Sequence, residues 1–126
     1  MDHNLSILIV EDERLISMML GQMLEKAGFT VCGIAPNLKK AYEVINSTNP
    51  DFALIDIHLE DGDNGIELGK ILNKEKNIPF AYVTAYSDSN TYEEAKKTKP
   101  IAFLHKPVSI ETIKTTIKEA LVKLPE

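Results

Sequence analysis

The chain has 126 residues, of which 44% are hydrophobic and 26% are charged, the profile of one folded domain and not of a disordered segment. Its formal net charge of −5 argues against nucleic-acid binding, because contacts to phosphates require a basic surface. A single cysteine, Cys32, excludes an internal disulfide and a cysteine-rich zinc site, and its apolar neighbours predict a buried, inert thiol. No segment approaches the roughly 18 apolar residues of a membrane span, and the N-terminus lacks a secretory signal, so we expect a cytoplasmic protein.

Short aliphatic runs alternate with stretches of helical spacing along the chain. Leu5–Val10 is a continuous aliphatic run, typical of a strand that is covered on both faces. Leu15–Ala27 follows with apolar residues at helical spacing and ends at Gly28. Thr30–Ala35 is the second predicted strand, and Asn37 can cap the helix that follows it.

The second part of the chain continues this alternation. The remaining predicted strands are Phe52–Ile57, Pro79–Thr84 and Ile101–His105. A loop with Gly62 and Gly65 leads from the first of these strands to a helix. A polar helix is expected from about Asp88 to Lys97, and Ser109 can cap the last helix.

Five strands that alternate with five helices predict right-handed crossovers and a parallel sheet with helices on both faces. The strand count and the chain length favour a doubly wound, flavodoxin-like (βα)5 fold with the strand order 2-1-3-4-5. No repeat, low-complexity tract or linker interrupts the alternation, so we expect one domain over residues 1–126. In such sheets a ligand binds beyond the carboxyl ends of the strands where the order reverses, here between strands one and three.

Polar residues follow four of the predicted strands at this edge of the sheet. They are Glu11 and Asp12 after the first strand, Asp56 near the end of the third, Thr84 at the end of the fourth and Lys106 after the fifth. Oxygen ligands without cysteine or histidine suit a hard cation such as Mg²⁺, which is typical where phosphate is handled. Each residue alone has an ordinary structural explanation as a turn, a cap or a surface residue, so the hypothesis depends on their convergence.

At these positions the sequence resembles the receiver domain of two-component response regulators, over essentially its whole length. The matching motifs are Glu11-Asp12 after strand one, Asp56 after ALI, Thr84-Ala85 after strand four and Lys106-Pro107 after FLH. They occur in the order expected for the family, each at the carboxyl end of its strand. The combination is specific, whereas the Lys-Pro pair alone would mean little.

The resemblance implies a phosphorelay signalling function, in which the domain catalyses only its own phosphorylation and dephosphorylation. Asp56 would accept a phosphoryl group from the phosphohistidine of a sensor histidine kinase or a phosphotransfer protein. Asp12 would bind Mg²⁺ directly together with Asp56, and Glu11 would bind it through water. The backbone carbonyl of His58 would supply another ligand to the metal.

The resemblance also implies a conformational switch. The Thr84 hydroxyl and the Lys106 ammonium would contact the phosphoryl group of the modified domain. Phe103 matches the aromatic switch position, and Pro107 matches the proline that usually follows a cis peptide bond. Their movement would change the face formed by the fourth helix, the fifth strand and the fifth helix, which is also the expected surface of a homodimer if one forms.

Two features depart from the commonest pattern of the family. The loop after Asp56 reads IHLEDGDNG, which lacks the frequent Met-Pro and is one residue longer before Gly65. The bulky residues His58 and Tyr86 lie two positions beyond Asp56 and Thr84. In the family these positions flank the route of the hydrolytic water, so the two rings predict slow self-dephosphorylation.

Three other functions on this fold are weighed against the receiver hypothesis. A flavodoxin-type FMN carrier needs a phosphate-binding loop after the first strand, where Glu11 and Asp12 would repel the phosphate. A haloacid-dehalogenase-type phosphatase has a second aspartate two residues after its nucleophile, where this chain has His58. A pseudo-receiver would only bind partners, yet Asp56, Thr84 and Lys106 are all retained. The sequence identifies neither the kinase nor an output domain beyond the last helix.

Overall fold

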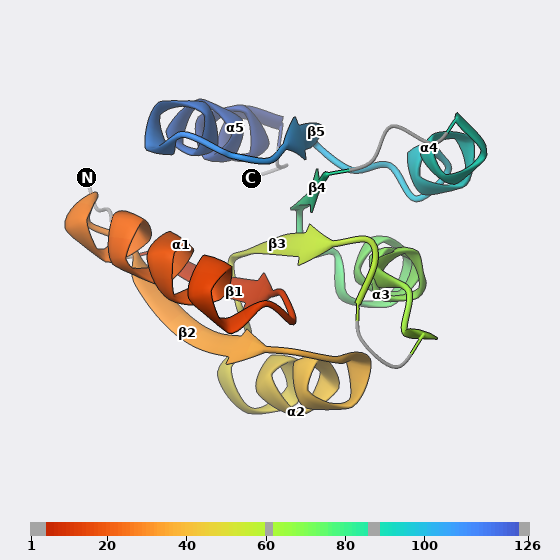
Figure 1. Ribbon diagram of the computed structural model, residues 1–126, viewed down its shortest axis with the longest axis horizontal. Helices are drawn as coiled ribbons and strands as arrows, with labels where there is room; N and C mark the ends of the chain where they lie inside the picture. Colours follow the sequence, from red (N-terminus) through yellow and green to blue (C-terminus); the bar gives the residue numbers. More distant parts are fainter. Residues whose placement is uncertain (1–4, 60–61, 86–88, 124–126) are drawn as a thin grey trace.

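The computed structural model describes residues 5–59, 62–85 and 89–123. Its strands are β1 (Ser6–Val10), β2 (Thr30–Ala35), β3 (Phe52–Asp56), β4 (Phe80–Thr84) and β5 (Ala102–His105). They form one parallel sheet in the order β2-β1-β3-β4-β5, which confirms the predicted topology (Figure 1). The predicted strand ends are correct to within one residue, and those of β2 are identical.

Helices cover both faces of this sheet (Figure 1). They are α1 (Arg14–Lys26), α2 (Leu38–Thr48), α3 (Gly65–Ile71), α4 (Ser89–Lys96) and α5 (Ile110–Lys123). Directly after α3 the chain forms a π-helical segment, Leu72–Lys76, which the sequence did not predict. Within the described residues, every helix is too short or too polar to pass through a bilayer.

Two hydrophobic cores lie on the two faces of the sheet. In β1, Leu8 and Val10 pack toward α2 and α3, whereas Ile7 and Ile9 pack toward α1 and α5. The strands β3 and β4 are buried along their whole length, as expected for strands covered on both faces. The edge strand β2 is less covered, so the predicted burial of Cys32 was wrong and its thiol is partly exposed.

Side-chain caps begin α2 and α3, two of the helices that leave the carboxyl edge of the sheet. The Asn37 side chain accepts a hydrogen bond from the Lys40 N–H at 2.9 Å at the start of α2, as predicted. Asn64 caps α3 in the same way by accepting the Ile66 N–H at 2.8 Å. These caps fix where each helix starts relative to the strand ends that precede it.

The first residue of α3, Gly65, lies directly against the end of β3. A Cβ atom at this position would overlap the backbone oxygen of Asp56 and lie 2.7 Å from Ile55 Cγ2. The Gly65 N–H also donates a hydrogen bond to the Ile57 carbonyl at 2.7 Å. The close approach of α3 to the strand therefore requires glycine.

A buried hydroxyl pair ties β4 to the turn that follows α4. Tyr82 is fully buried, and its hydroxyl lies 2.6 Å from Thr98 Oγ1. Because the Thr98 hydroxyl donates to the Ala95 carbonyl, also at 2.6 Å, the Tyr82 hydroxyl is the donor to Thr98. Burial raises the pKa of Tyr82 to about 12.

The raised pKa of Tyr82 predicts a specific loss of stability at alkaline pH. The stabilisation is complete below the ordinary pKa of 10.0 and is lost as the pH rises through about 12. Between about pH 9 and about pH 12, the wild type should lose on the order of 2 kcal/mol more unfolding free energy than Tyr82→Phe. Urea denaturation at each pH measures this difference, with Tyr92→Phe on the exposed side of α4 as the control. Equal pH dependence in wild type and Tyr82→Phe would contradict the prediction.

The surroundings of Gly65 and Gly21 predict that replacing each with alanine changes the free energy of unfolding in opposite directions. Gly65→Ala should lower the free energy of unfolding by roughly 1–3 kcal/mol, because the new methyl group overlaps the Asp56 backbone. Gly21→Ala, inside α1, should raise it by about 0.5–1 kcal/mol, since its Cβ would lie 3.8 Å from the nearest side chain and alanine favours helix. Chemical denaturation of both variants tests the pair, and a neutral Gly65→Ala would refute the close approach.

Candidate functional site

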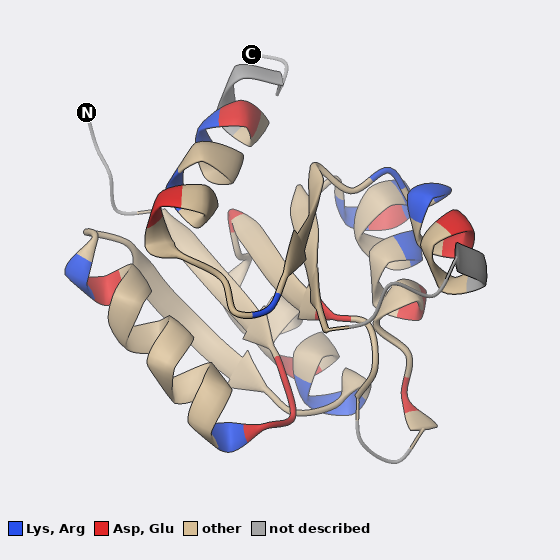
Figure 2. Ribbon diagram, turned by 45° about the horizontal axis from the view of Figure 1, so that its top comes forward, with Lys and Arg blue, Asp and Glu red and all other residues tan. Residues whose placement is uncertain are grey.

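The carboxyl edge of the sheet brings the predicted site residues together. Asp56 is the last residue of β3, and Thr84 is the last residue of β4, the neighbouring strand. Glu11 and Asp12 directly follow β1, on the other side of β3, and Lys106 directly follows β5. In Figure 2 the connection from β1 to α1 is drawn red because it is acidic.

Three carboxylates form a cluster that could hold a cation. Glu11, Asp12 and Asp56 each offer one oxygen, and these oxygens all lie within 4.8 Å of one another. Glu11 and Asp56 are buried, with 2% and 6% of their surface exposed, whereas Asp12 is partly exposed. Among the described residues, this is the one group of acids or histidines whose ligand atoms lie close enough together to hold a metal ion. A donor set of carboxylate oxygens fits a hard ion such as Mg²⁺.

The Lys106 ammonium bridges the two buried carboxylates. Its Nζ atom lies 2.8 Å from Glu11 Oε1 and donates a hydrogen bond to Asp56 Oδ2 at 3.0 Å. Burial alone would lower the pKa of Lys106, but the Glu11 and Asp56 carboxylates outweigh it and raise that pKa above its ordinary value. The ammonium therefore stays charged at neutral pH.

The Glu11 carboxylate accepts fewer hydrogen bonds than the Asp56 carboxylate. Its Oε2 atom accepts a hydrogen bond from the Glu13 N–H at 2.9 Å. Its buried Oε1 atom contacts Lys106 as an ion pair, but the geometry is not that of a hydrogen bond, and no described group donates one to it. Burial raises the pKa of Glu11, and the contacts with Lys106 and with the Glu13 N–H oppose that shift. This oxygen therefore keeps the capacity to bind a cation or a water ligand.

The backbone after β3 orients the second oxygen of Asp56. The His58 N–H donates a hydrogen bond to Asp56 Oδ1 at 3.1 Å, while Lys106 holds Oδ2. The sequence did not predict this contact, because no side-chain signal marks a backbone donor. The His58 side chain is exposed, and Tyr86 lies outside the described residues, so slow dephosphorylation remains a prediction.

Thr84 and Lys106 are joined through the backbone. The Lys106 N–H donates to the Thr84 carbonyl at 3.0 Å, which continues the pairing of β4 with β5. Thr84 is buried, with 4% of its surface exposed. The peptide bond between Lys106 and Pro107 is cis. The three residues thus form one connected unit beside Asp56.

Phe103 lies between the interior and the surface of α4. Its ring centroid is 5.6 Å from that of buried Tyr82 and 4.4 Å from that of Tyr92, which is exposed on α4. The Lys96 ammonium lies 5.4 Å from the centroid of the Tyr92 ring, within cation–π distance. A row of aromatic rings therefore connects β4 and β5 with the outer side of α4.

An apolar groove opens beside the acidic site. It has a volume of about 330 Å³ between α1 and the segment after β5. The residues that line it are Ile16, Met19, Leu20, Met23, Lys106, Pro107 and Val108. Next to it, α1 exposes Leu15, Met18 and Met19, with 72%, 47% and 55% of their surfaces accessible. Helix α1 therefore presents apolar side chains to solvent close to Lys106.

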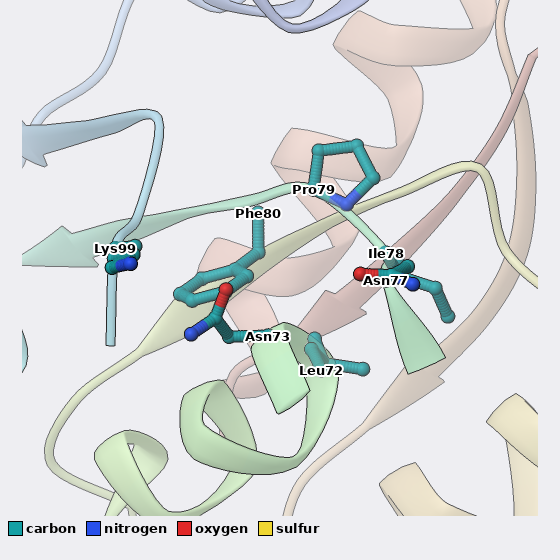
Figure 3. A pocket seen from close by; sticks show the side chains of 7 residues that line it. All are labelled: Leu72, Asn73, Asn77, Ile78, Pro79, Phe80 and Lys99. Atoms are coloured by element: carbon teal, nitrogen blue, oxygen red, sulfur yellow. The ribbon is translucent and has the colours of Figure 1, made fainter. Parts of the chain in front are cut away.

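A second hollow, of about 450 Å³, lies at the opposite edge of the sheet (Figure 3). Its walls are the start of the π-helical segment, the chain entering β4, and Lys99 before β5. Lys99 is exposed, and Asn73 lies over Phe80 (Figure 3). The chain entering β4 and Lys99 before β5 lie at the amino ends of these strands. The hollow is therefore separate from the acidic cluster, which lies at the carboxyl ends.

Comparison with known proteins places the chain in a family. The sequence matches the family model described as Response regulator receiver domain over residues 7–118. Transcriptional regulatory protein PdtaR of Mycobacterium tuberculosis is 31% identical over 120 residues, which are 95% of this chain and 58% of that protein. Sporulation initiation phosphotransferase F of Bacillus subtilis is 29% identical over 119 residues, with 94% of each protein covered. The chain thus spans less than two thirds of PdtaR and almost all of the Bacillus protein.

Solved structures give the same result. The signal receiver domain of modulated diguanylate cyclase from Desulfovibrio desulfuricans G20 has a TM-score of 0.90 and 34% identity, with 96% of both chains covered. A CheY-like receiver domain protein from Methanospirillum hungatei has a TM-score of 0.86 and 28% identity, with 96% of both chains covered. Sequence, fold and the acidic edge of the sheet agree, and the chain belongs to the response regulator receiver domains of two-component signalling.

Proposed function

We propose that Asp56 accepts a phosphoryl group and that the modified domain transmits a signal. The observation that carries the proposal is the environment of the Asp56 carboxylate. It is buried, it belongs to the acidic cluster, and each of its oxygens accepts one hydrogen bond, from His58 N–H at 3.1 Å and from Lys106 Nζ at 3.0 Å. A nucleophile held in this way is oriented before its substrate arrives.

Charge neutralisation supports the same role. The Lys106 ammonium lies 3.0 Å from Asp56 Oδ2, so its positive charge offsets negative charge at the reacting carboxylate. Attack by an Asp56 oxygen on a phosphohistidine forms an O–P bond as the N–P bond breaks and the imidazole leaves. Because this transfer depends mainly on positioning and electrostatics, the domain needs no further nucleophile or base.

We propose Mg²⁺ as the cation of the acidic cluster. Asp12 and Asp56 would bind it directly, Glu11 would bind it through water, and the backbone carbonyl of His58 would be a further ligand. When bound, Mg²⁺ neutralises the charge that develops on the transferred phosphoryl oxygens. The buried Glu11 oxygen that accepts no hydrogen bond from the described residues supports this assignment.

The signal would pass from Thr84 to the surface through Phe103. Phosphorylation adds about −2 of charge beside Thr84 and Lys106, which would draw the Thr84 hydroxyl toward the new group. Phe103 is in contact with Tyr92 of α4, so a turn of its ring would change the face formed by α4, β5 and α5. That face would then bind an output partner or a second copy of the chain.

The apolar side of α1 is the surface that we assign to the phosphodonor protein. Receiver domains interact with histidine kinases or phosphotransfer proteins. A donor protein must bring its phosphohistidine to Asp56, and the groove between α1 and Pro107 includes Lys106 of the site itself. Exposed Leu15, Met18 and Met19 supply apolar contact area next to this opening.

Incubation with acetyl phosphate and Mg²⁺ tests the phosphoacceptor. We expect one phosphoryl group per chain, located on Asp56 by mass spectrometry, and no modification without Mg²⁺. Asp56→Asn should abolish the modification, because the amide is not a nucleophile, whereas Asp51→Asn at the other end of β3 should leave it unchanged. Continuous hydrolysis of phosphate monoesters would instead favour a phosphatase, and a bound flavin would favour an FMN carrier.

A substitution in α1 separates donor docking from chemistry. Met19→Asp should slow phosphoryl transfer at least about tenfold from a kinase or phosphotransfer protein that serves the wild type, because it places a charge in an apolar contact. Modification by acetyl phosphate should stay at the wild-type rate. Met19→Leu, which keeps an apolar side chain, is the matched control. Equal slowing with both donors would show that α1 supports the site and not the docking.

A further inference from the structure

Asp63 connects the loop after Asp56 to the first turn of α2. Its Oδ2 atom accepts a hydrogen bond from the backbone N–H of Leu38 at 2.9 Å, across 25 residues of sequence. Leu38 is the first residue of α2, so this N–H has no acceptor within the helix. The negative charge also interacts favourably with the helix dipole at this end. The contact thus holds the loop on a neighbouring helix.

The same loop is connected to the carboxylate of Asp56. The Asp63 carbonyl accepts the Leu59 N–H at 3.1 Å, and His58 forms an antiparallel bridge with Asn64. These contacts pair the outgoing arm, 57–59, with the returning arm, 62–65. The next step is the hydrogen bond from the His58 N–H to Asp56 Oδ1. A short chain of contacts therefore runs from the start of α2 to the nucleophile.

Without the Asp63 side chain, the returning arm would keep its contacts to α3 and to the outgoing arm. Asn64 caps α3, and the Gly65 N–H donates to the Ile57 carbonyl at 2.7 Å. These contacts fix the end of the loop, and the Asp63 side chain adds a hydrogen bond from the loop to α2.

We propose that Asp63 is a positioning residue for the phosphoacceptor reaction. By holding the loop on α2, it fixes the backbone of His58, whose N–H orients Asp56 and whose carbonyl is assigned to the metal. A small displacement of a reacting group lowers a rate strongly, so loss of this restraint should slow the reaction. This inference rests on the proposed role of Asp56.

The chain offers a matched control for this contact. Asp51 Oδ2 accepts the Ser6 N–H at 2.8 Å, which is also a carboxylate bound to a backbone donor distant in sequence. That pair joins the start of β3 to the start of β1, at the edge of the sheet away from Asp56. Asp51→Ala therefore removes the same kind of bond without touching the loop. Asp63→Asn keeps an acceptor and removes only the charge.

The first measurement is amide hydrogen exchange in the metal-free, unphosphorylated protein. Loss of one such hydrogen bond corresponds to roughly fivefold faster exchange. We expect Asp63→Ala to accelerate exchange of both the Leu38 and the His58 amides by at least this factor, Asp63→Asn to accelerate it less, and Asp51→Ala to leave both unchanged. An unchanged His58 amide in Asp63→Ala would overturn the proposal, because the restraint would then stop at α2.

The second measurement is the rate of modification by acetyl phosphate at saturating Mg²⁺. Asp63→Ala should lower it by about three- to tenfold, Asp63→Asn should recover most of the rate, and Asp51→Ala should match the wild type. Equal rates in Asp63→Ala and Asp51→Ala would overturn the positioning role. If the wild type itself were not modified, the proposed function would fail, and the exchange of the His58 amide would still decide whether Asp63 positions this backbone.

Discussion

The site depends on one lysine that compensates two buried carboxylates. Glu11 and Asp56 lie on either side of Lys106 Nζ, at 2.8 and 3.0 Å, and Asp12 adds a third acid nearby. Buried charges are stable only when they are paired, and here two buried carboxylates share one ammonium. The four groups together carry a charge of −2 when all are ionised. One divalent cation would cancel this charge, which supports the proposed metal site.

The parallel sheet makes this cluster possible. Each of its acids and its lysine lies at or just after the end of a strand, and parallel strands bring those ends to one edge. The strands β1, β3 and β4 are almost entirely buried, so the side chains at their ends rest on a rigid support. Gly65 extends that support, because α3 touches the Asp56 backbone only where no Cβ intervenes. The core therefore fixes the geometry of the acidic cluster.

Local sequence predicted the strands and the five α-helices because these depend on patterns within a few residues, whereas the acidic edge followed from the strand order inferred from them and from the family motifs. It did not predict the partial exposure of Cys32, which follows from the place of β2 at the edge of the sheet. It also missed two contacts, the Lys106 bridge to Glu11 and the bond from Leu38 to Asp63, since each joins residues distant in sequence. Such contacts need the tertiary arrangement, which hydrophobic periodicity does not specify.

A phosphoryl group on Asp56 would have to compete with Glu11 for the Lys106 ammonium. Lys106 Nζ is shared between Asp56 and Glu11, whereas its backbone N–H is committed to the Thr84 carbonyl. New charge beside Asp56 would therefore redirect the Lys106 side chain while the paired backbones of β4 and β5 stay in place. The response that we propose would then begin with the side chains of Thr84 and Phe103. Because the Phe103 ring already contacts Tyr92, even a side-chain rearrangement reaches the surface of α4.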